Sequence, residues 1–249
     1  MKLNEAARFI EKIASYKIQF NEKDFKEFEV RELKSIAAID GSSIKILDSG
    51  NFSVFLIRAA YVVVDNEIKK YVGDVSIEIL EDETKIDEIR ENMEFDLAKN
   101  LNAEIILIDG IPRELKENVI GISKKSGLKI GNAPFLYLIK KYGDKIYPER
   151  RWYYKIDETK YAVKFHPYAR FAFRVDATGN VEEKLSKVAS FCNEIGIIGY
   201  PYPLAMAHRL AEIKKEEADY IKNRLKEEAR IEDWENIFYD YHEYMEGEK

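Results

Sequence analysis

Two aspartates occupy matching positions in this chain, each at the end of an apolar run and each followed directly by glycine. Asp40 ends the run in SIAAIDGSS, and Asp109 ends the run in AEIILIDGIP. If both runs are strands of an open α/β sheet, both carboxylates lie at its carboxyl-terminal edge, where such sheets place their sites. Neighbouring carboxylates repel unless a cation lies between them, and Mg²⁺ and Mn²⁺ prefer oxygen ligands. The pair therefore predicts a divalent metal site.

The stretch between the two aspartates supplies a third carboxylate. Apolar residues recur at helical spacing through IDEIRENMEFDLAKNL, and Glu94 falls among them. A glutamate that faces inward needs a partner. Asp40, Glu94 and Asp109 together would form a site suited to two-metal hydrolysis of a phosphodiester. The ordinary alternatives are that the Asp-Gly pairs form simple turns and that the glutamate is a solvated surface charge.

Three further side chains are candidates for the same chemistry. His208, in the stretch GYPYPLAMAHRLA, is a candidate metal ligand or proton shuttle. Tyr200, near the start of that stretch, is a candidate support for a phosphate or for a metal-bound water. Lys124, at the end of the predicted strand VIGISKK, is a candidate phosphate contact. The ordinary alternatives are a helix-surface histidine, one of 16 tyrosines and a strand-end lysine.

The stretch KFHPYARFAFR, which contains His166, combines basic and aromatic residues. Such a mixture suits a path for nucleic acid, because aromatic rings stack on bases and cations contact the backbone. A half-buried strand would also produce this alternation of polar and aromatic residues. On the sequence alone, the half-buried strand is preferred over the nucleic-acid path.

The elements that must position these residues alternate between helix and strand. Residues 1 to about 34 are predicted to be helical, and residues 36 to 80 to form antiparallel strands with turns at Ser49-Gly50 and Asp65-Asn66. The helix of Glu94 and the apolar strand after it are typical of a crossover to a parallel strand.

The later segments of the chain are also predicted to alternate between helices and strands. A helix interrupted by Gly143 precedes further strands, and a long helix is predicted from Leu204 to about Glu232. The predicted fold class is therefore α/β, with a mixed sheet flanked by helices. We expect a single domain over residues 1–249, with an N-terminal helix (about 1–34) and a C-terminal helical segment (about 204–249).

Composition limits the classes of function. The net charge of −6 in a chain that is 35% charged argues against nucleic-acid binding by global attraction, although a local basic groove remains compatible with it. Cys192 is the single cysteine, which excludes an intrachain disulfide and favours a reducing compartment. The sequence contains no apolar run of 18 residues and no secretory signal, so a cytoplasmic protein without a membrane span is expected. Abundant Lys and Glu with a single Gln favour a thermophilic source.

The motifs above, taken in order, resemble the NurA family of nucleases. The resemblance covers residues 36 to about 214 and depends on IAAIDGSS, ENMEFDLAK, ILIDG, GISKKS and the closing IGYPYPLAMAHRLA. It implies an RNase H-like fold and a manganese-dependent nuclease (magnesium being the alternative ion), with two ions per site. It further implies single-strand endonuclease and 5′-to-3′ exonuclease activity on single- and double-stranded DNA during end resection in DNA repair, with a hexameric HerA-type ATPase as partner.

The resemblance also assigns roles to individual residues. It implies that the metal ligands are Asp40, Glu94, Asp109 and His208, and that the catalytic set adds the closing-motif tyrosine, Tyr200, and the lysine of the ISK segment, Lys124. Glu91 is an alternative to Glu94 as the acidic metal ligand on this helix, because it lies about one helical turn earlier. Two departures from the family pattern leave the shape of the groove open: the second acid is followed by GIP, and the segment from Asp109 to Lys124 is short.

The family also implies a ring-forming homodimer, which would hold a strand by topology instead of by net charge. The amphipathic segment 4–16 and the aromatic segment WENIFYDYHEYM are candidate contact surfaces, the alternative being that both pack on their own domain. Two other functions remain open: a non-catalytic, nuclease-like adaptor in DNA processing, and a different RNase H-like hydrolase that acts on RNA or branched DNA.

Overall fold

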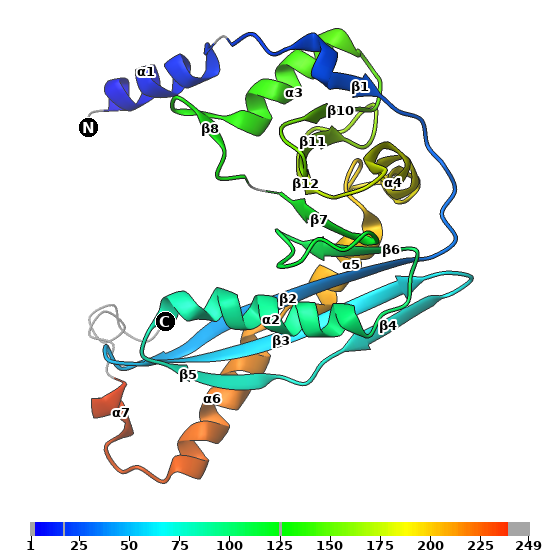
Figure 1. Ribbon diagram of the computed structural model, residues 1–249. Coiled ribbons are helices and arrows are strands. Elements are labelled where there is room, and N and C mark those ends of the chain that lie inside the picture. The colour runs from blue at the N-terminus through cyan, green and yellow to red at the C-terminus, as the bar shows by residue number, and fades with distance from the viewer. Residues whose placement is uncertain (1–2, 17, 125, 239–249) are drawn as a thin grey trace. The chain divides into compact units, whose positions relative to one another are not determined.

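Helices and strands alternate along residues 3–16, 18–124 and 126–238, which the computed structural model describes (Figure 1). The helices are α1 (Leu3–Ala14), α2 (Ile86–Lys99), α3 (Phe135–Ile146), α4 (Val181–Val188), α5 (Tyr202–Ala211), α6 (Lys215–Ala229) and α7 (Trp234–Ile237). The strands are β1 (Phe25–Glu27), β2 (Ile36–Asp48), β3 (Ser53–Val64), β4 (Ile68–Val72), β5 (Ser76–Leu80), β6 (Ile105–Asp109), β7 (Val119–Ser123), β8 (Lys129–Ile130), β9 (Ala133–Pro134), β10 (Trp152–Lys155), β11 (Lys160–Lys164) and β12 (Phe173–Asp176). None of these helices combines the length and apolar composition that crossing a membrane requires.

Hydrogen-bonded strands, parallel and antiparallel, combine with flanking helices, which confirms the predicted α/β fold class. The chain divides into two compact units. Unit 1 comprises Met1–Ala38, Val63–Ile68 and Asn102–Ala205, and unit 2 comprises Ile39–Val62, Lys69–Leu101 and Met206–Lys249. That residues 1–249 act as one domain stays a prediction.

Unit 1 contains the strand series β1-β10-β11-β12-β7-β6. Its pairs are antiparallel from β1 to β7, whereas β6 and β7 are parallel, with Asp109 opposite Ile122. β6 and β7 are buried along nearly their whole length, as strands covered on both faces are. The side chain of Asp109 therefore lies at the carboxyl end of a buried parallel strand, as the sequence predicted.

Unit 2 shows that one turn prediction was wrong. β2 does not end at Asp40 but continues to Asp48, so the Asp40-Gly41 pair lies inside a strand. The turn comes at Ser49-Gly50, where Gly50 has a φ of +80° and its N–H donates to the Asp48 carboxylate. The second predicted turn, at Asp65-Asn66, is present. Because β2 continues past Asp40, Gly41 must have a role other than turning the chain.

The sheet of unit 2 has a helix against each face. Along β2, Gly41 contacts α2, whereas Ile44 and Ile46 pack in the cluster that includes the α6 residue Ala218. Odd and even positions of a strand point to opposite faces, so α2 and α6 cover opposite faces of β2 (Figure 1). Asp40 has the same parity as Ile44 and therefore points to the face opposite α2.

The predicted helix over residues 1–34 is too long. α1 ends at Ala14, and Phe25 then enters β1, where it pairs with Tyr154 of β10. Phe20 and Phe25 pack with Trp152 in an aromatic cluster of unit 1. Burial of these rings stabilises the extended backbone more than helical propensity could, since each aromatic side chain buries a large apolar area.

The C-terminal helical segment is interrupted rather than continuous. Between α5 and α6 the backbone turns extended at Lys214, and Ile213 packs against Leu56 of β3. α6 ends at Arg230, which adopts the left-handed conformation with a φ of +52°. The last predicted helical and contact residues, 239–249, lie outside the described residues.

The sequence predicted that Gly143 interrupts the helix, and this was wrong: α3 continues through Gly143 to Ile146. A Cβ atom at this position would lie 2.6 Å from the Trp152 ring and 2.9 Å from Phe25. The glycine is therefore the place where the helix approaches the aromatic cluster closely, and the cost of glycine in a helix is offset by the packing of Trp152.

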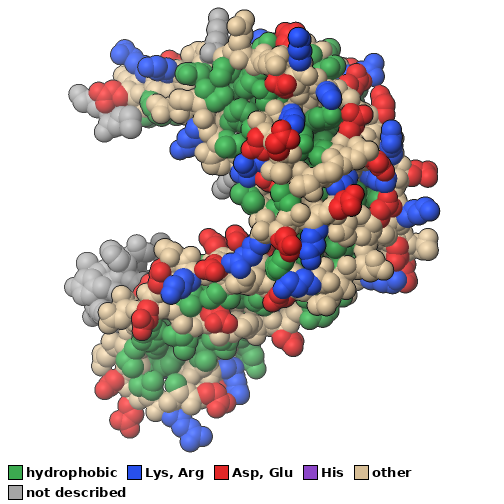
Figure 2. All heavy atoms as spheres, in the orientation of Figure 1, with side chains coloured by type: hydrophobic (Ala, Val, Ile, Leu, Met, Phe, Trp, Pro, Cys, Tyr) green, Lys and Arg blue, Asp and Glu red, His purple; other side chains and the backbone are tan. Residues whose placement is uncertain are grey.

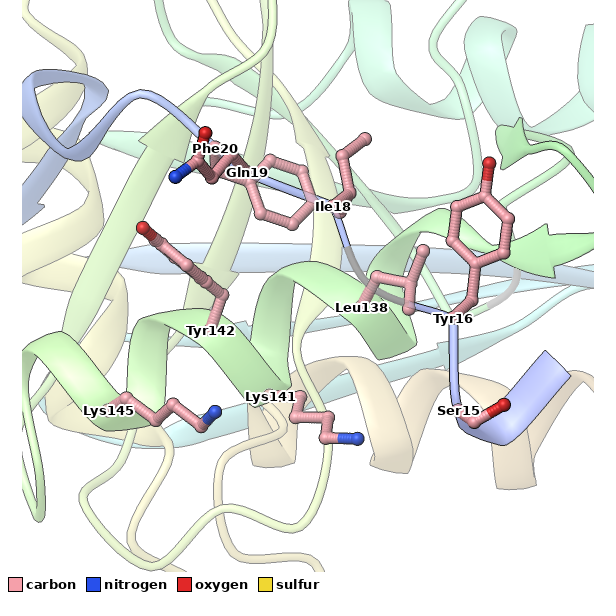
Figure 3. A pocket seen from close by; sticks show the side chains of 9 residues that line it. All are labelled: Ser15, Tyr16, Ile18, Gln19, Phe20, Leu138, Lys141, Tyr142 and Lys145. Atoms are coloured by element: carbon pink, nitrogen blue, oxygen red, sulfur yellow. The ribbon is translucent and has the colours of Figure 1, made fainter. Parts of the chain in front are cut away.

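A cavity of about 550 Å³ lies beside the same cluster, where the segment after α1 passes α3 (Figure 3). Phe20, Leu138 and Tyr142 form its apolar wall, and Lys141 and Lys145 line its α3 side. None of the predicted site residues lines this cavity, so it does not bear on the predicted chemistry.

A charged group lies within the core of unit 1. The Lys164 side chain is 4% exposed, and its ammonium donates to Asp144 Oδ1 at 2.8 Å. The Trp152 indole donates to the same oxygen, and Lys140 donates to Oδ2. Burial raises the pKa of Asp144, but the hydrogen bonds from Lys140, Lys164 and Trp152 outweigh it and lower that pKa below its usual value.

We expect Asp144→Asn to reduce the free energy of unfolding by about 3 kcal/mol, because it leaves the Lys164 ammonium buried without an anion. Urea unfolding of the variant measures this change. The matched control is Asp96→Asn, which removes an exposed ion pair with Lys99 and should cost less than about 1 kcal/mol. Equal effects of the two substitutions would contradict the assignment.

The lowered pKa of Asp144 also predicts how the stability of the protein depends on pH. A carboxylate whose folded pKa is lowered stabilises the fold above its unfolded pKa of about 3.9, and this stabilisation is lost as the pH falls through the folded value. At neutral pH the Asp144→Asn variant should therefore have a lower free energy of unfolding than the wild type. Below pH about 4 this free energy should fall less in the variant than in the wild type.

Candidate active site

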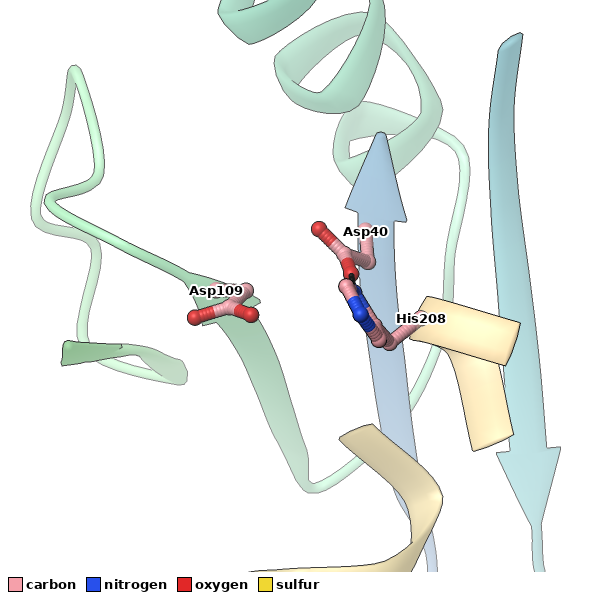
Figure 4. A group of neighbouring side chains, drawn as sticks. All are labelled: Asp40, Asp109 and His208. Atoms are coloured by element: carbon pink, nitrogen blue, oxygen red, sulfur yellow. Dashed lines mark hydrogen bonds and ion pairs between the residues drawn. The ribbon is translucent and has the colours of Figure 1, made fainter. Parts of the chain in front are cut away.

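Asp40 is a buried carboxylate bound to a histidine. Asp40 is 3% exposed, and its Oδ2 lies 2.6 Å from Nδ1 of His208 on α5 (Figure 4). Its Oδ1 accepts the backbone N–H of Gly41 at 2.9 Å. An ionised Asp40 carboxylate accepts the hydrogen bond from Nδ1 of His208. The His208 side chain is 59% exposed.

Glu94 is the buried carboxylate of α2. It is 2% exposed, and Arg90 donates to its Oε1 at 2.5 Å from one turn earlier. Burial lowers the pKa of the Arg90 guanidinium, but the carboxylates of Glu94, Asp87 and Asp40 outweigh this and raise it. Arg90 therefore stays charged and links Glu94 electrostatically to Asp40. Glu91, the alternative from the sequence, is only half-buried.

The role of Gly41 follows from the position of Glu94. A Cβ atom on Gly41 would lie 2.6 Å from Glu94 Oε1 and 2.8 Å from Cγ of Arg90. Real Cβ atoms do not come so close to other heavy atoms, so only glycine allows this approach. The glycine after Asp40 therefore seats the Arg90–Glu94 pair against the strand, on the face opposite Asp40.

We expect Gly41→Ala to displace the Glu94 carboxylate while leaving the fold intact. The atoms in the way belong to flexible side chains, so the free energy of unfolding should change by only about 1 kcal/mol. If Glu94 takes part in catalysis, a displacement of this size should lower metal-dependent cleavage about 10- to 100-fold.

Gly127→Ala is the matched control, because nothing lies within 4 Å of a Cβ atom at Gly127. The comparison needs a thermal melt and a cleavage rate for both variants. Unchanged cleavage by a folded Gly41→Ala variant would exclude Glu94 from the reaction.

Asp109 lies in a second charged group, in unit 1. Its Oδ2 accepts a hydrogen bond from Lys124 Nζ at 2.7 Å, and the Lys124 ammonium lies 5.0 Å from the centre of the Tyr200 ring. Tyr200 is 8% exposed and packs on Phe173 at 5.4 Å. Gly110 has a φ of +118°, which only glycine adopts without strain, so the chain turns directly after Asp109.

The structure thus brings the predicted residues together in two groups. Asp40 lies with His208, and Glu94 packs against the next residue of β2 on the opposite face of the strand, all in unit 2. Asp109, Lys124 and Tyr200 form the group in unit 1. The assignment of these residues to catalysis or metal binding stays a prediction. Sequence reasoning missed Arg90, although its spacing of four from Glu94 on a helix was a signal for an ion pair.

One face of the molecule carries charges of both signs. Over the face shown in Figure 2, acidic and basic side chains of the described residues are interspersed. A field of one sign is therefore not what would bring a substrate to this face.

Comparison with known proteins identifies relatives of the whole chain. The family model described as "NurA domain" matches residues 34–213. The crystal structure of the NurA nuclease from Sulfolobus solfataricus has 17% identity and a TM-score of 0.66, and the match covers 93% of this chain and 96% of that one. A structure of NurA bound to dAMP and manganese has 12% identity and a TM-score of 0.63, covering 92% and 95%. A third, of NurA with manganese, has 11% identity and a TM-score of 0.66, covering 92% and 98%. No curated protein sequence matches the chain.

Proposed function

The chain belongs to the NurA family, and from this membership we propose that it is a metal-dependent DNA nuclease. The observation that carries the proposal is the buried Asp40 carboxylate paired with His208, with Glu94 also buried nearby. A buried acid is expensive unless a partner or a cation compensates it. The manganese and dAMP in structures of the same fold support the same chemistry.

The donor set fits a divalent cation such as Mn²⁺. Asp40 and His208 offer carboxylate oxygens and an imidazole nitrogen, and Asp109 offers a further carboxylate, all donor types that such an ion accepts. We propose Glu94 as the ligand of a second ion. When bound, the cations would supply charge stabilisation at the phosphate and a nucleophile at neutral pH.

The side chains of the protein have separate tasks in this proposal. The Asp40 carboxylate orients the His208 ring through Nδ1, which leaves Nε2 as the nitrogen that would bind a cation. Lys124 donates to Asp109 here, and with a cation held by that carboxylate its ammonium would be available to a phosphate oxygen. The ring of Tyr200 positions the Lys124 ammonium. Arg90 fixes the Glu94 carboxylate against the strand.

The finer activity is proposed from the family resemblance. We propose single-strand endonuclease and 5′-to-3′ exonuclease activity in DNA end resection, with a hexameric HerA-type ATPase as partner. We also propose a homodimer. Its support is the net charge of −6, which favours holding DNA by enclosure over holding it by global attraction.

The nuclease proposal is tested with labelled single- and double-stranded DNA in the presence of Mn²⁺, Mg²⁺ or a chelator. We expect cleavage with Mn²⁺ and none with the chelator. Binding of DNA without cleavage in either metal would favour the non-catalytic adaptor. Cleavage of RNA in preference to DNA would favour another RNase H-like hydrolase.

Light scattering tests the proposed dimer. None of the described side chains of α1 is buried, and Phe9 and Ile10 are 47% and 65% exposed. We expect twice the monomer mass at micromolar concentration and a shift to the monomer when Phe9 and Ile10 are replaced by serine. A monomeric wild-type protein over that range would contradict the proposal.

A further inference from the structure

The loop between β11 and β12 exposes large aromatic side chains. Tyr168 is 71% exposed and Phe171 is 61% exposed. The sequence favoured a half-buried strand here, and that interpretation was wrong: β11 ends at Lys164 and β12 begins at Phe173. Pro167 has no N–H for a sheet ladder, which favours the loop. These two rings lie three positions apart in one short loop, which makes the loop a candidate binding surface.

Small buried residues anchor this loop and hold the large ones outward. Ala169 and Ala172 are 4% and 5% exposed. A Cβ atom on Gly199 would lie 2.4 Å from Cβ of Ala169, so the loop packs directly on Gly199. The N–H of Tyr168 donates to Nδ1 of His166 at 3.1 Å, and the N–H of Ala169 donates to the His166 carbonyl at 3.0 Å. The exposed rings are therefore held on a braced backbone.

The protonation state of His166 suits this bracing. Burial, together with the nearby charges of Arg151 and Lys164, lowers the pKa of His166 below its usual value. At neutral pH the ring is therefore neutral, and its Nδ1 can accept the N–H of Tyr168.

Contacts within unit 1 connect the loop to Asp109. Gly199, on which Ala169 packs, precedes Tyr200. The Tyr200 ring lies beneath Lys124, and Lys124 binds Asp109. A ligand that lies on the loop is thus adjacent to the residues proposed to contact phosphate.

Positive charge accompanies the rings. The Arg170 guanidinium lies 5.4 Å from the centre of the Phe171 ring. At the start of the loop, Arg151 Nε donates to the Phe165 carbonyl. Proteins that bind single strands combine aromatic rings, on which bases stack, with cations that track the backbone.

From these contacts we propose that residues 166–172 form a stacking platform, on which Tyr168 and Phe171 hold unpaired bases of single-stranded DNA beside Asp109 and Lys124. This rests on the proposed nuclease function and names the substrate as a strand with free base faces. A duplex keeps its bases stacked on each other and cannot use the platform.

Binding of labelled oligothymidylate, with Ca²⁺ in place of Mn²⁺ to prevent turnover, tests the platform. Tyr168→Ala and Phe171→Ala should each weaken binding about 5- to 100-fold, which is the usual range for loss of one stacked base. Tyr168→Phe keeps the ring and should bind as the wild type does. On an abasic strand of the same length, all these variants should equal the wild type.

Two controls separate stacking from other effects. Tyr220→Ala removes a ring of similar exposure (66%) on α6 and should leave binding unchanged. Arg170→Ala should reduce the dependence of log affinity on log salt by about 0.7, the value for one phosphate contact to a single strand. Melting temperatures should not change, because each ring is exposed.

The outcomes distinguish this inference from the proposed function. If the wild type cleaves DNA with Mn²⁺ but Tyr168→Ala and Phe171→Ala bind oligothymidylate as the wild type does, the platform alone is wrong. An equal loss on the abasic strand also overturns it, because bases are then not involved. A wild type that neither cleaves nor binds DNA overturns both. Tighter binding of oligouridylate would assign the platform to RNA and overturn the DNA assignment.

Discussion

Asp40→Asn should lower the Mn²⁺-dependent cleavage rate by at least about 10³-fold while the protein stays folded. Asparagine has nearly the same size as aspartate and keeps an oxygen that can accept the His208 N–H. It loses the negative charge that a divalent cation needs, and loss of a few kcal/mol of transition-state stabilisation corresponds to this factor. The melting temperature should stay within a few degrees of the wild-type value, because removal of the buried charge and the retained His208 hydrogen bond offset the lost acceptor of the Gly41 N–H.

Asp48→Asn is the matched control for this variant. Asp48 lies on the same strand but is 48% exposed in an ion pair with Lys45, so its substitution should leave cleavage unchanged. A second readout does not depend on turnover. Mn²⁺ should raise the melting temperature of the wild type by mass action on the folded state, and this increase should be absent in Asp40→Asn. Normal cleavage by a folded Asp40→Asn variant would show that the site is elsewhere.

Asp109→Asn should also lower cleavage about 10³-fold, for the same electrostatic reason. The side chain is 17% exposed and its partner Lys124 is 41% exposed, so loss of the ion pair should change stability by less than about 1 kcal/mol. A thermal melt beside the cleavage assay therefore separates loss of chemistry from loss of fold.

Lys124→Met tests whether Lys124 contacts a phosphate in addition to neutralising the charge of Asp109. If it contacts a phosphate, its loss should weaken DNA binding and reduce cleavage about 10- to 100-fold, with the Mn²⁺ stabilisation unchanged. Loss of that stabilisation in Lys124→Met but not in Asp109→Asn would reverse the two assignments.

Much of the fold was predictable from the sequence because the signals are local. The period of the apolar residues gave the helix of Glu94, and the continuous apolar run gave the buried strand that ends at Asp109. Glycine after that aspartate correctly predicted the chain turn. The same local logic failed at Asp40-Gly41 and at Gly143, because glycine also serves where another element approaches the backbone closely.

The sequence by itself determined which residue types were present for the chemistry, and in what order: two aspartates after apolar runs, a helix glutamate and a late histidine. Only the tertiary structure decided which of them meet. Asp40 and His208 are 168 positions apart in the chain, and no periodicity links residues so distant. Glu94 rather than Glu91 is buried because α2 packs its face against Gly41. Strand register and helix packing fix such contacts, since they depend on the free energy of the whole core and not on the residues nearby in sequence.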